Sequence, residues 1–301
     1  MRTLKEYARI VEQRLETLPE KLPEGEYAIG GMPWLLSESM RYSLTAGGKR
    51  LRPSMFLACA EMLGGSADEL LDFACAIEMI HTYSLIHDDL PGMDDDTMRR
   101  GRPTNHVVFG VGQAILAGDG LLNFAFETML GCALRHPERA KAFLAAIDEV
   151  ARGCGVTGMI AGQVMDLYCE HTRVADVRAL EYIQRNKPAC MFIYPLRAAG
   201  RLCGADEAQL SALEEYGRAF GLLFQATDDL LDVTGSAAEM GKTLGKDAQS
   251  GKLTCVSAYG VDGTRRLVDE LHRSAVESIR KFGDDAEFFV ELVDEMVGRT
   301  H

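Results

Sequence analysis

The chain has 301 residues, of which 47% are hydrophobic and 26% charged, as is usual for a globular protein that buries a sizeable core. Its formal net charge of −13 argues against a nucleic-acid partner, because binding to phosphate backbones depends on an excess of Lys and Arg.

The eight cysteines lie mostly in apolar stretches and form no Cys-x-x-Cys pair. This pattern argues against a zinc site or a disulfide framework and predicts reduced core residues.

The first 19 residues are studded with charge and lack the apolar core of a signal peptide. No later stretch approaches the roughly 18 uncharged apolar residues of a membrane-spanning helix. We therefore expect a cytoplasmic protein with no membrane span.

Apolar residues recur at three- and four-residue spacing along most of the chain, which predicts one helix after another. The apolar faces of two such helices are traced by Leu70, Phe73, Ala74, Ile77, Ile80 and His81, and by Tyr216, Phe220, Leu223 and Leu230. Breaks rich in Gly and Pro fall at residues 19–31, 64–65, 91–92, 101–103, 137, 204 and 235–251. The prediction is a single all-α domain over residues 1–301.

Two acidic segments of similar form each close a predicted helix: Asp88, Asp89 and Asp94 in the first, and Asp228, Asp229 and Asp232 in the second. Asp228 and Asp232 are four residues apart and share a helix face, where they repel each other unless a cation lies between them. Pro91-Gly92 can end the first helix and fold Asp94 back. Clusters that offer only oxygen ligands suit hard cations, and magnesium above all.

Basic residues are interleaved with these acidic segments. They are Lys49, Arg50 and Arg52 before Pro53, Arg99 and Arg100 after the first acidic segment, and Lys187, Lys242, Lys246 and Lys252 around the second. Arg makes forked contacts to phosphate oxygens and Lys acts as a point charge. Together the acidic and basic segments indicate a magnesium-dependent site for two anionic substrates.

Five segments carry a resemblance to a known family: Gly47–Pro53, His81–Asp89, Met93–Gly101, Gly158–Gln163 and Phe224–Asp232. They look like the signature segments of the trans-isoprenyl diphosphate synthases, or polyprenyl synthetases, in the family's order and over nearly the whole chain. The nearest forms are bacterial farnesyl diphosphate synthases and short-chain geranylgeranyl-type synthases. The resemblance implies the type I isoprenoid synthase fold, with long helices around a central cavity, and a homodimer.

The resemblance also implies site residues. Magnesium ions, three to an active site, would be held by Asp88, Asp89, Asp94, Asp228, Asp229 and Asp232. The allylic diphosphate would be contacted by Arg99, Lys187, Gln225 and Lys242, and isopentenyl diphosphate by Lys49, Arg52, His81, Arg100 and Lys252. The residues expected to act in catalysis are Asp88, Asp89, Asp94, Arg99, Lys187, Asp228, Asp229 and Lys242. The implied reaction is magnesium-assisted ionisation of dimethylallyl or geranyl diphosphate, condensation with isopentenyl diphosphate, and loss of a proton.

Two features refine this expectation. The family usually has Thr after the lysine at 187, whereas this chain has Pro188, which biases Lys187 away from helical geometry. Tyr83 and Ser84 lie five and four residues before Asp88, about one helical turn deeper in the expected cavity. A bulky aromatic there is similar to the farnesyl diphosphate synthases, which predicts a fifteen-carbon product, with twenty carbons as the alternative.

Three other functions account for part of this pattern. A terpene cyclase would share the fold, and a non-catalytic partner subunit would explain Pro188. A His-Asp phosphohydrolase built on His81, His87 and Asp88 would leave the second acidic segment without a role. We expect His87 to be a packing or hydrogen-bonding helix residue, and Asp95 and Asp96 to face solvent. Asp119 could equally cap a helix or belong to the site, and no role is assigned to Gln163, Asp166 or Arg299.

Overall fold

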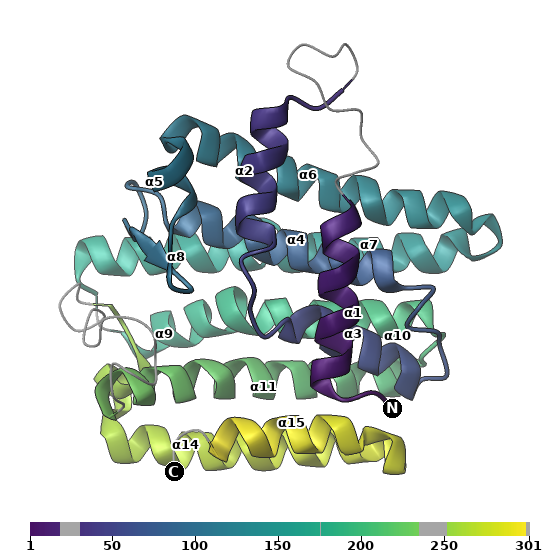
Figure 1. Cartoon of the computed structure of the whole chain (residues 1–301). Helices are drawn as coiled ribbons and strands as arrows, with labels where there is room; N and C mark the ends of the chain where they lie inside the picture. Colours follow the sequence, from purple (N-terminus) through teal and green to yellow (C-terminus); the bar gives the residue numbers. More distant parts are fainter. Residues whose placement is uncertain (19–30, 175, 235–251, 299–301) are drawn as a thin grey trace. The chain divides into compact units, whose positions relative to one another are not determined.

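The computed structural model describes residues 1–18, 31–174, 176–234 and 252–298, and the contacts within the chain group it into two compact units. The N-terminal unit comprises residues 2–58 and 66–147, and the C-terminal unit comprises residue 1, residues 59–65 and residues 148–301. The prediction of an all-α protein is confirmed, because helices make up nearly all the regular structure described (Figure 1). The prediction of a single domain stays a prediction.

The helices that begin in the N-terminal unit are α1 (Leu4–Thr17), α2 (Trp34–Leu44), α3 (Leu51–Met62), α4 (Leu71–Asp88), α5 (Asn105–Phe109), α6 (Val111–Arg135), the 3₁₀ turn η2 (Pro137–Arg139) and α7 (Ala140–Cys154). Helix α1 begins at a capping box: the Glu6 N–H donates to Thr3 Oγ1 (3.3 Å), and the Thr3 N–H donates to Glu6 Oε2 (2.8 Å). Its buried residues Tyr7, Val11 and Leu15 recur every fourth position. The charge pattern of residues 1–19 did not indicate this helix.

Helix α4 is the core of the N-terminal unit and carries the first acidic segment at its end. It packs against α6, and also against α1 and α2 (Figure 1). Eleven of its residues are buried, including Phe73, Ile77 and Ile80 from the predicted face. A helix that is apolar on nearly all sides belongs in the interior. The predicted helix over this stretch is therefore confirmed.

A small hairpin interrupts the helices after α4. Strands β1 (Met98–Arg99) and β2 (Arg102–Pro103) pair antiparallel, with Arg99 opposite Arg102. The two residues between them, Arg100 and Gly101, have φ angles of +53° and +74°. A two-residue turn of type I′ needs positive φ at both positions. The sequence predicted a break here but not the hairpin.

The C-terminal unit holds α8 (Met159–Thr172), α9 (Val177–Gln184), the π-helical turn η3 (Arg185–Ala189), α10 (Cys190–Leu202), α11 (Glu207–Thr234), α14 (Cys255–Ile279), the 3₁₀ stretch η4 (Arg280–Ala286) and α15 (Glu287–Gly298). Figure 1 shows α10, α11, α14 and α15 (green to yellow) side by side. Aromatic contacts join them, because the Tyr216 ring packs edge-on against Phe289 and its hydroxyl donates to the Phe289 carbonyl (2.8 Å).

Pro188 lies inside the π-helical turn η3, which joins α9 to α10. In an α-helix a proline ring clashes with the carbonyl four residues back, and a widened turn relieves that clash. Lys187 therefore stays in a continuous helical path but outside regular α geometry. The expectation that Pro188 takes Lys187 away from helical geometry is therefore corrected: Lys187 remains helical, in a π turn instead of an α turn.

All eight cysteines are free, and seven of them are buried. Burial raises the pKa of the Cys154 and Cys190 thiols to about 11 and that of Cys255 to about 12. The predicted core location is thus confirmed for seven of the eight cysteines. Within the described residues, no helix combines the length and hydropathy needed to cross a membrane.

Candidate active site

The first acidic segment forms where α4 ends. Asp88 is the last residue of the helix and Asp89 caps it, after which Pro91 and Gly92 turn the chain. The backbone N–H of Asp94 donates to the Asp88 carbonyl (2.8 Å). The predicted return of Asp94 toward Asp88 is therefore confirmed, and both side chains are partly exposed.

Asp89 differs from its neighbours, because its carboxylate is buried and paired. Arg99, on the hairpin, donates from Nε to both carboxylate oxygens (2.8 and 2.9 Å), and its Nη2 lies 2.7 Å from Oδ1. Burial raises the pKa of Asp89 even though the Arg99 hydrogen bond opposes it. Burial alone would lower the pKa of Arg99, but its hydrogen bond to Asp89 and the surrounding carboxylates raise it. Two residues predicted to act on the substrate thus hold each other in the free protein.

A basic cluster lies at the start of α3 and beside α4. Lys49 is exposed, and Arg52 Nη1 lies 3.2 Å from His81 Nε2. Arg100, at the tip of the hairpin, donates to the Gly47 carbonyl and lies over Gly48, where a Cβ would approach its Cζ to 2.7 Å. Four of the residues predicted to bind isopentenyl diphosphate are thus close together in the N-terminal unit.

His81 is uncharged in this cluster. Burial and the positive charges of Arg52 and Arg100 hold its pKa well below its usual value. Because a guanidinium only donates, Nε2 of the neutral ring is the acceptor of the Arg52 hydrogen bond. His81 therefore orients a cation without adding charge.

Tyr83 is buried in α4 one turn before the acidic end. Its ring packs edge-on against the His87 imidazole, with 5.7 Å between centroids. The His87 Nε2 lies 3.1 Å from the Ile115 carbonyl, in a notch of α6 that exists because residue 118 is glycine; a Cβ there would come within 2.1 Å of the imidazole. The packing role predicted for His87 fits these contacts. Ser84 donates to the His81 carbonyl (2.9 Å).

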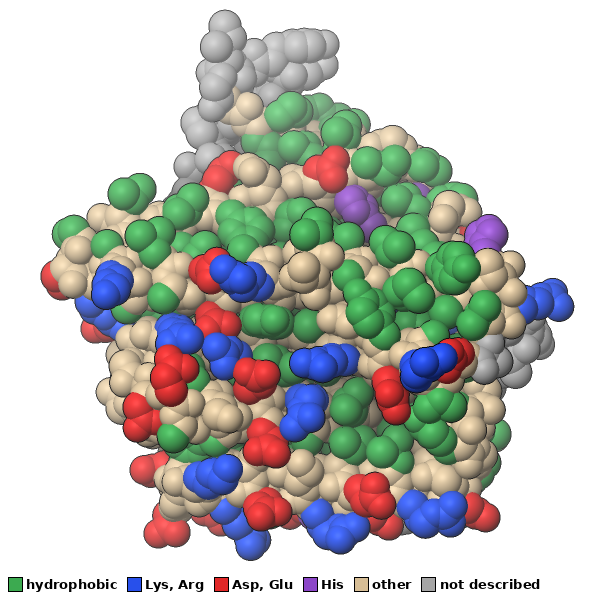
Figure 2. All heavy atoms as spheres, turned by 180° about the vertical axis from the view of Figure 1, so that it is seen from behind, with side chains coloured by type: hydrophobic (Ala, Val, Ile, Leu, Met, Phe, Trp, Pro, Cys, Tyr) green, Lys and Arg blue, Asp and Glu red, His purple; other side chains and the backbone are tan. Residues whose placement is uncertain are grey.

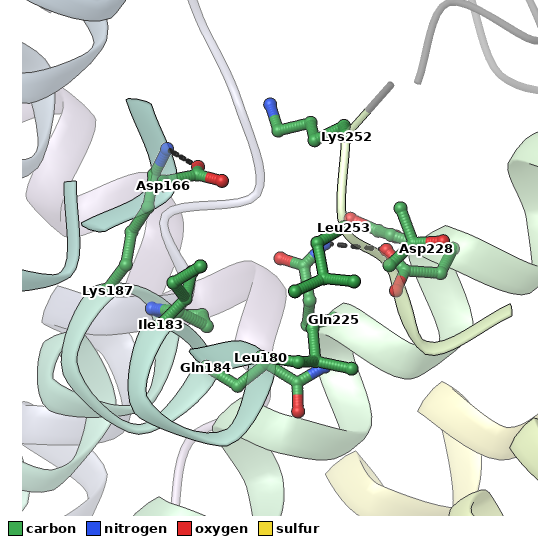
Figure 3. A pocket seen from close by; sticks show the side chains of 12 residues that line it. Asp166, Leu180, Ile183, Gln184, Lys187, Gln225, Asp228, Lys252 and Leu253 are labelled. Carbon is green, nitrogen blue, oxygen red and sulfur yellow. Dashed lines mark hydrogen bonds and ion pairs between the residues drawn. The ribbon is translucent and has the colours of Figure 1, made fainter. Parts of the chain in front are cut away.

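The second acidic segment lies in α11, beside a pocket of about 210 Å³ in the C-terminal unit (Figure 3). Asp228 and Gln225 line it from α11, Lys187 lines it from η3, and Lys252 lines it from the stretch before α14. Figure 3 shows the Lys252 and Asp228 side chains at the same pocket. Asp228 and Asp232 lie one turn apart on α11, as the spacing predicted.

Asp229 is turned into the protein. One carboxylate oxygen accepts from Gln225 Nε2 (2.8 Å) and the other from the backbone N–H of Cys255 (2.7 Å), the first residue of α14. Its side chain thus satisfies a helix N-terminus and ties α14 to α11. This structural contact was not foreseen from the sequence.

Lys187 is held at the pocket by an ion pair. Its Nζ lies 2.8 Å from Asp166 Oδ2 of α8, and the dashed line in Figure 3 marks this contact. Helix α8 and the turn η3 approach closely because residue 162 is glycine. A Cβ there would come within 2.5 Å of the backbone nitrogen of Lys187. Asp166 is a pocket residue to which the sequence assigned no role, and only its place three residues after Gln163 on a predicted helix pointed to it.

The remaining residues named from the sequence lie outside these two acidic segments and the basic cluster. Lys242, Lys246 and Arg299 lie outside the described residues. Asp119 lies well inside α6, so the N-cap alternative is wrong; its Oδ1 is 3.9 Å from His87 Nε2. Asp95 is exposed, as expected, and Asp96 is half-buried. Both amide atoms of Gln163 are buried and make no hydrogen bond within the described part of the chain.

The donor set fits magnesium bound together with a phosphate group. Over the described residues, no group of three or more His, Cys, Asp or Glu side chains could hold a metal by itself. Magnesium is commonly held by one or two carboxylates and completed by substrate phosphates and water. The partly exposed Asp88, Asp94 and Asp228 offer such oxygen ligands, and the cations near them can bind the remaining phosphate oxygens.

The comparisons with known proteins agree with this chemistry. Residues 33–286 match the family model for Polyprenyl synthetase. The chain is 44% identical over 254 residues to geranylgeranyl pyrophosphate synthase 9, chloroplastic, of Arabidopsis thaliana, a match covering 83% of this chain and 70% of that protein. Its structure is similar to an FPP/GFPP synthase of Zymomonas mobilis (TM-score 0.83, 32% identity, 98% of each chain covered). It is also similar to a geranyltransferase of Legionella pneumophila (TM-score 0.84, 29% identity, 99% of this chain and 96% of that one).

Proposed function

Because this chain belongs to the polyprenyl synthetase family and is a short-chain prenyltransferase, we propose that it condenses isopentenyl diphosphate with dimethylallyl and geranyl diphosphate and releases mainly farnesyl diphosphate. The observation that carries the choice of product is the buried Tyr83 ring, one turn before the first acidic segment. The similar solved structure named as an FPP/GFPP synthase supports the same product class.

The proposed metal is magnesium; Asp88 and Asp94 are its proposed ligands in the N-terminal unit, and Asp228 is a separate proposed ligand in the C-terminal unit. When bound, the metal stabilises the negative charge that develops on a departing diphosphate. Asp89, Asp229 and Asp232 stay as further candidates. Asp89 would have to leave Arg99 to bind metal directly, and Asp229 would have to leave the Cys255 N–H.

The protein's own groups hold the two substrates. Lys187, Gln225 and Lys252 line one pocket and are proposed to bind the allylic diphosphate. Arg99 stays a candidate diphosphate ligand in the N-terminal unit. The cluster of Lys49, Arg52 and Arg100, with neutral His81 orienting Arg52, is proposed to bind isopentenyl diphosphate. This differs from the expectation that Lys252 serves the isopentenyl site, because Lys252 lines the pocket of Asp228 and Lys187.

The bond changes follow from the substrates. The allylic carbon–oxygen bond breaks and leaves an allylic cation, which the isopentenyl double bond attacks to form the new carbon–carbon bond. The resulting cation loses a proton, which the released diphosphate accepts. Fixed positive groups around that diphosphate stabilise the transition state most when water is excluded.

A second product is supported by the curated relatives. Those at 42–45% identity are named geranylgeranyl pyrophosphate synthases. The twenty-carbon product is therefore the second candidate. A terpene cyclase gains no support from these names, and the partner-subunit alternative weakens because Lys187 still lines the pocket despite Pro188.

We propose that the protein acts as a homodimer. Hydrophobic side chains gather on the face of the molecule seen in Figure 2. On α5 and α6, large apolar side chains are exposed, among them Val108 (46%), Leu116 (57%) and Leu134 (83%). An exposed apolar face of this kind marks an interaction site.

The free cysteines suit a reducing compartment, for which we propose the cytoplasm.

The decisive experiment incubates the purified protein with isopentenyl diphosphate, magnesium and, in turn, five-, ten- and fifteen-carbon allylic diphosphates. We expect magnesium-dependent elongation that stops at fifteen carbons and that EDTA abolishes. Tyr83→Ala should shift the product toward twenty carbons or more, since it removes the ring from the expected tail path, while Tyr42→Ala serves as a control on another helix. A wild-type product of twenty carbons would contradict the farnesyl assignment but not the proposed reaction.

A further inference from the structure

Arg50 lies between Lys49 and Arg52 in the basic cluster, yet its side chain points inward. It is only 3% exposed. Its backbone has a φ of +48°, after Gly47 and Gly48 at +80° and +135°. The Arg50 carbonyl accepts the first backbone hydrogen bond of α3, from Ser54 (3.1 Å). The chain thus makes an unusual turn here and buries one of its three cations.

Three contacts hold the Arg50 guanidinium. Nη1 donates to Glu78 Oε1 on α4 (2.7 Å), Nη2 donates to the Leu44 carbonyl (2.8 Å), and Nε lies 3.4 Å from Glu12 Oε1 on α1. Glu78 is itself only 1% exposed. A buried ion pair adds little net stability over well-packed apolar residues, whereas contacts from three different nitrogens of one guanidinium fix its orientation. The consequence of this pair is therefore orientation.

Arg52, the next cation of the loop, contacts the same turn of α4. Glu78 and His81 are three residues apart and contact Arg50 and Arg52 respectively. Arg100 covers the other end of the loop through the Gly47 carbonyl. Like charges crowded in this way repel one another. The Glu78 carboxylate compensates the innermost charge, so that the remaining cations can be held together.

We propose that Arg50 and Glu78 form a positioning pair that fixes the loop of residues 47–52, so that Lys49, Arg52 and Arg100 bind the diphosphate of isopentenyl diphosphate. Neither Arg50 nor Glu78 touches the substrate. This inference rests on the function proposed above and adds residues that the site itself does not include.

The test replaces the pair by apolar residues of similar length, Arg50→Met with Glu78→Met. Because neither partner is left with an unpaired buried charge, the double variant should fold with nearly the wild-type melting temperature. We expect its KM for isopentenyl diphosphate to rise at least about tenfold, with kcat and the KM for geranyl diphosphate changed less than about twofold. Arg14→Met is the matched control, since it removes another partly buried ion pair to α4 (Arg14–Asp72, 2.6 Å) and should leave every KM unchanged.

Arg50→Lys covers the case in which the double variant does not fold. It keeps the charge but cannot reach both Glu78 and the Leu44 carbonyl, so a rise of about threefold in the same KM is expected. An unchanged KM in either folded variant overturns the positioning role. If the wild type elongates no primer, the proposed function fails, and calorimetric titration of isopentenyl diphosphate without magnesium then decides: weaker binding to the variants supports the pair, while equal or no binding overturns it.

Discussion

Adjacent aspartates in each acidic segment occupy different surroundings. Asp228 is partly exposed and lines a pocket, whereas Asp229 is 3% exposed and accepts hydrogen bonds from Gln225 and Cys255. The same contrast holds for Asp88 and Asp89 in the N-terminal unit. Motif spacing alone treats both members of each pair as equivalent metal ligands.

This contrast leads to a prediction for the second pair. Asp228→Asn should lower kcat at least about 100-fold because it removes a proposed magnesium ligand, with the free energy of unfolding nearly unchanged. Asp229→Asn should lower the free energy of unfolding by about 1–3 kcal/mol, because it disturbs a buried acceptor of two N–H groups. Urea unfolding and steady-state kinetics on both variants would check this. Equal stability losses in the two would contradict the division.

The contacts between individual side chains were the least predictable part of the site. The acidic and basic residues could be identified from their types and spacing. The pairing of Arg99 with Asp89 could not, because it depends on a two-residue hairpin that the sequence showed only as a break. Arg50 could not be separated from Lys49 and Arg52, since burial of one cation among three depends on Glu78 in another helix.

His81 predicts a dependence of stability on pH. Its pKa is well below the usual value in the folded protein, so below about pH 6.5 the unfolded chain binds a proton that the folded chain does not. Stability should therefore rise with pH in this range and fall as the solution is acidified. The slope from this one group is at most about 1.4 kcal/mol per pH unit. Unfolding of wild type and His81→Asn at about pH 5.0 and 6.5 measures it; parallel pH slopes would rule the effect out.

At the scale of elements, glycine decides how closely helices approach around the pocket. A Cβ at Gly162 of α8 would lie 2.5 Å from the Lys187 nitrogen of η3, and one at Gly221 of α11 would lie 2.6 Å from the Ala189 Cα. Both contacts are with backbone, which cannot rotate away. The π-helical turn is thus held from two sides.

Gly162→Ala should therefore lower the free energy of unfolding by about 1–3 kcal/mol, as overpacking does in a tight core, and should raise the KM for the allylic substrate. Gly131→Ala is the matched control: it also lies in a helix, α6, but its Cβ would meet only the end of the Arg135 side chain at 3.5 Å. That change should stabilise by about 0.5–1 kcal/mol, since alanine favours helix more than glycine. Thermal unfolding of the two variants should shift in opposite directions.

Helices were predicted more reliably than the segments that connect them. The apolar period at residues 70–81 begins at the N-cap of α4 and continues within that helix, and the period at residues 216–230 lies within α11. The amphipathic α1, the hairpin and the form of the turn at Pro188 were not foreseen. Each of these depends on contacts made with other elements, which periodicity along one segment does not contain.

At the scale of the whole molecule, the exposed apolar residues of α6 make oligomeric state testable. Leu116 and Leu134 are 18 residues, or about five helical turns, apart and so lie on one face. Leu116→Arg with Leu134→Glu should convert the proposed dimer to a monomer while helicity is retained, because charged groups are disfavoured in an interface core. Light scattering after gel filtration would report the mass. A dimer that survives both substitutions would move the interface elsewhere.

The free, largely buried cysteines have a further consequence. They are distributed over α3, α4, α6, α7, α8, α10 and α14, and over the turn after α10. A thiol is alkylated through its thiolate, which burial suppresses until the surrounding structure opens. The rate at which iodoacetamide modifies each cysteine in the native protein therefore measures how often that part of the chain unfolds locally. Mass spectrometry of the alkylated peptides would yield a map of local opening free energies along the helices, with no label introduced by mutation.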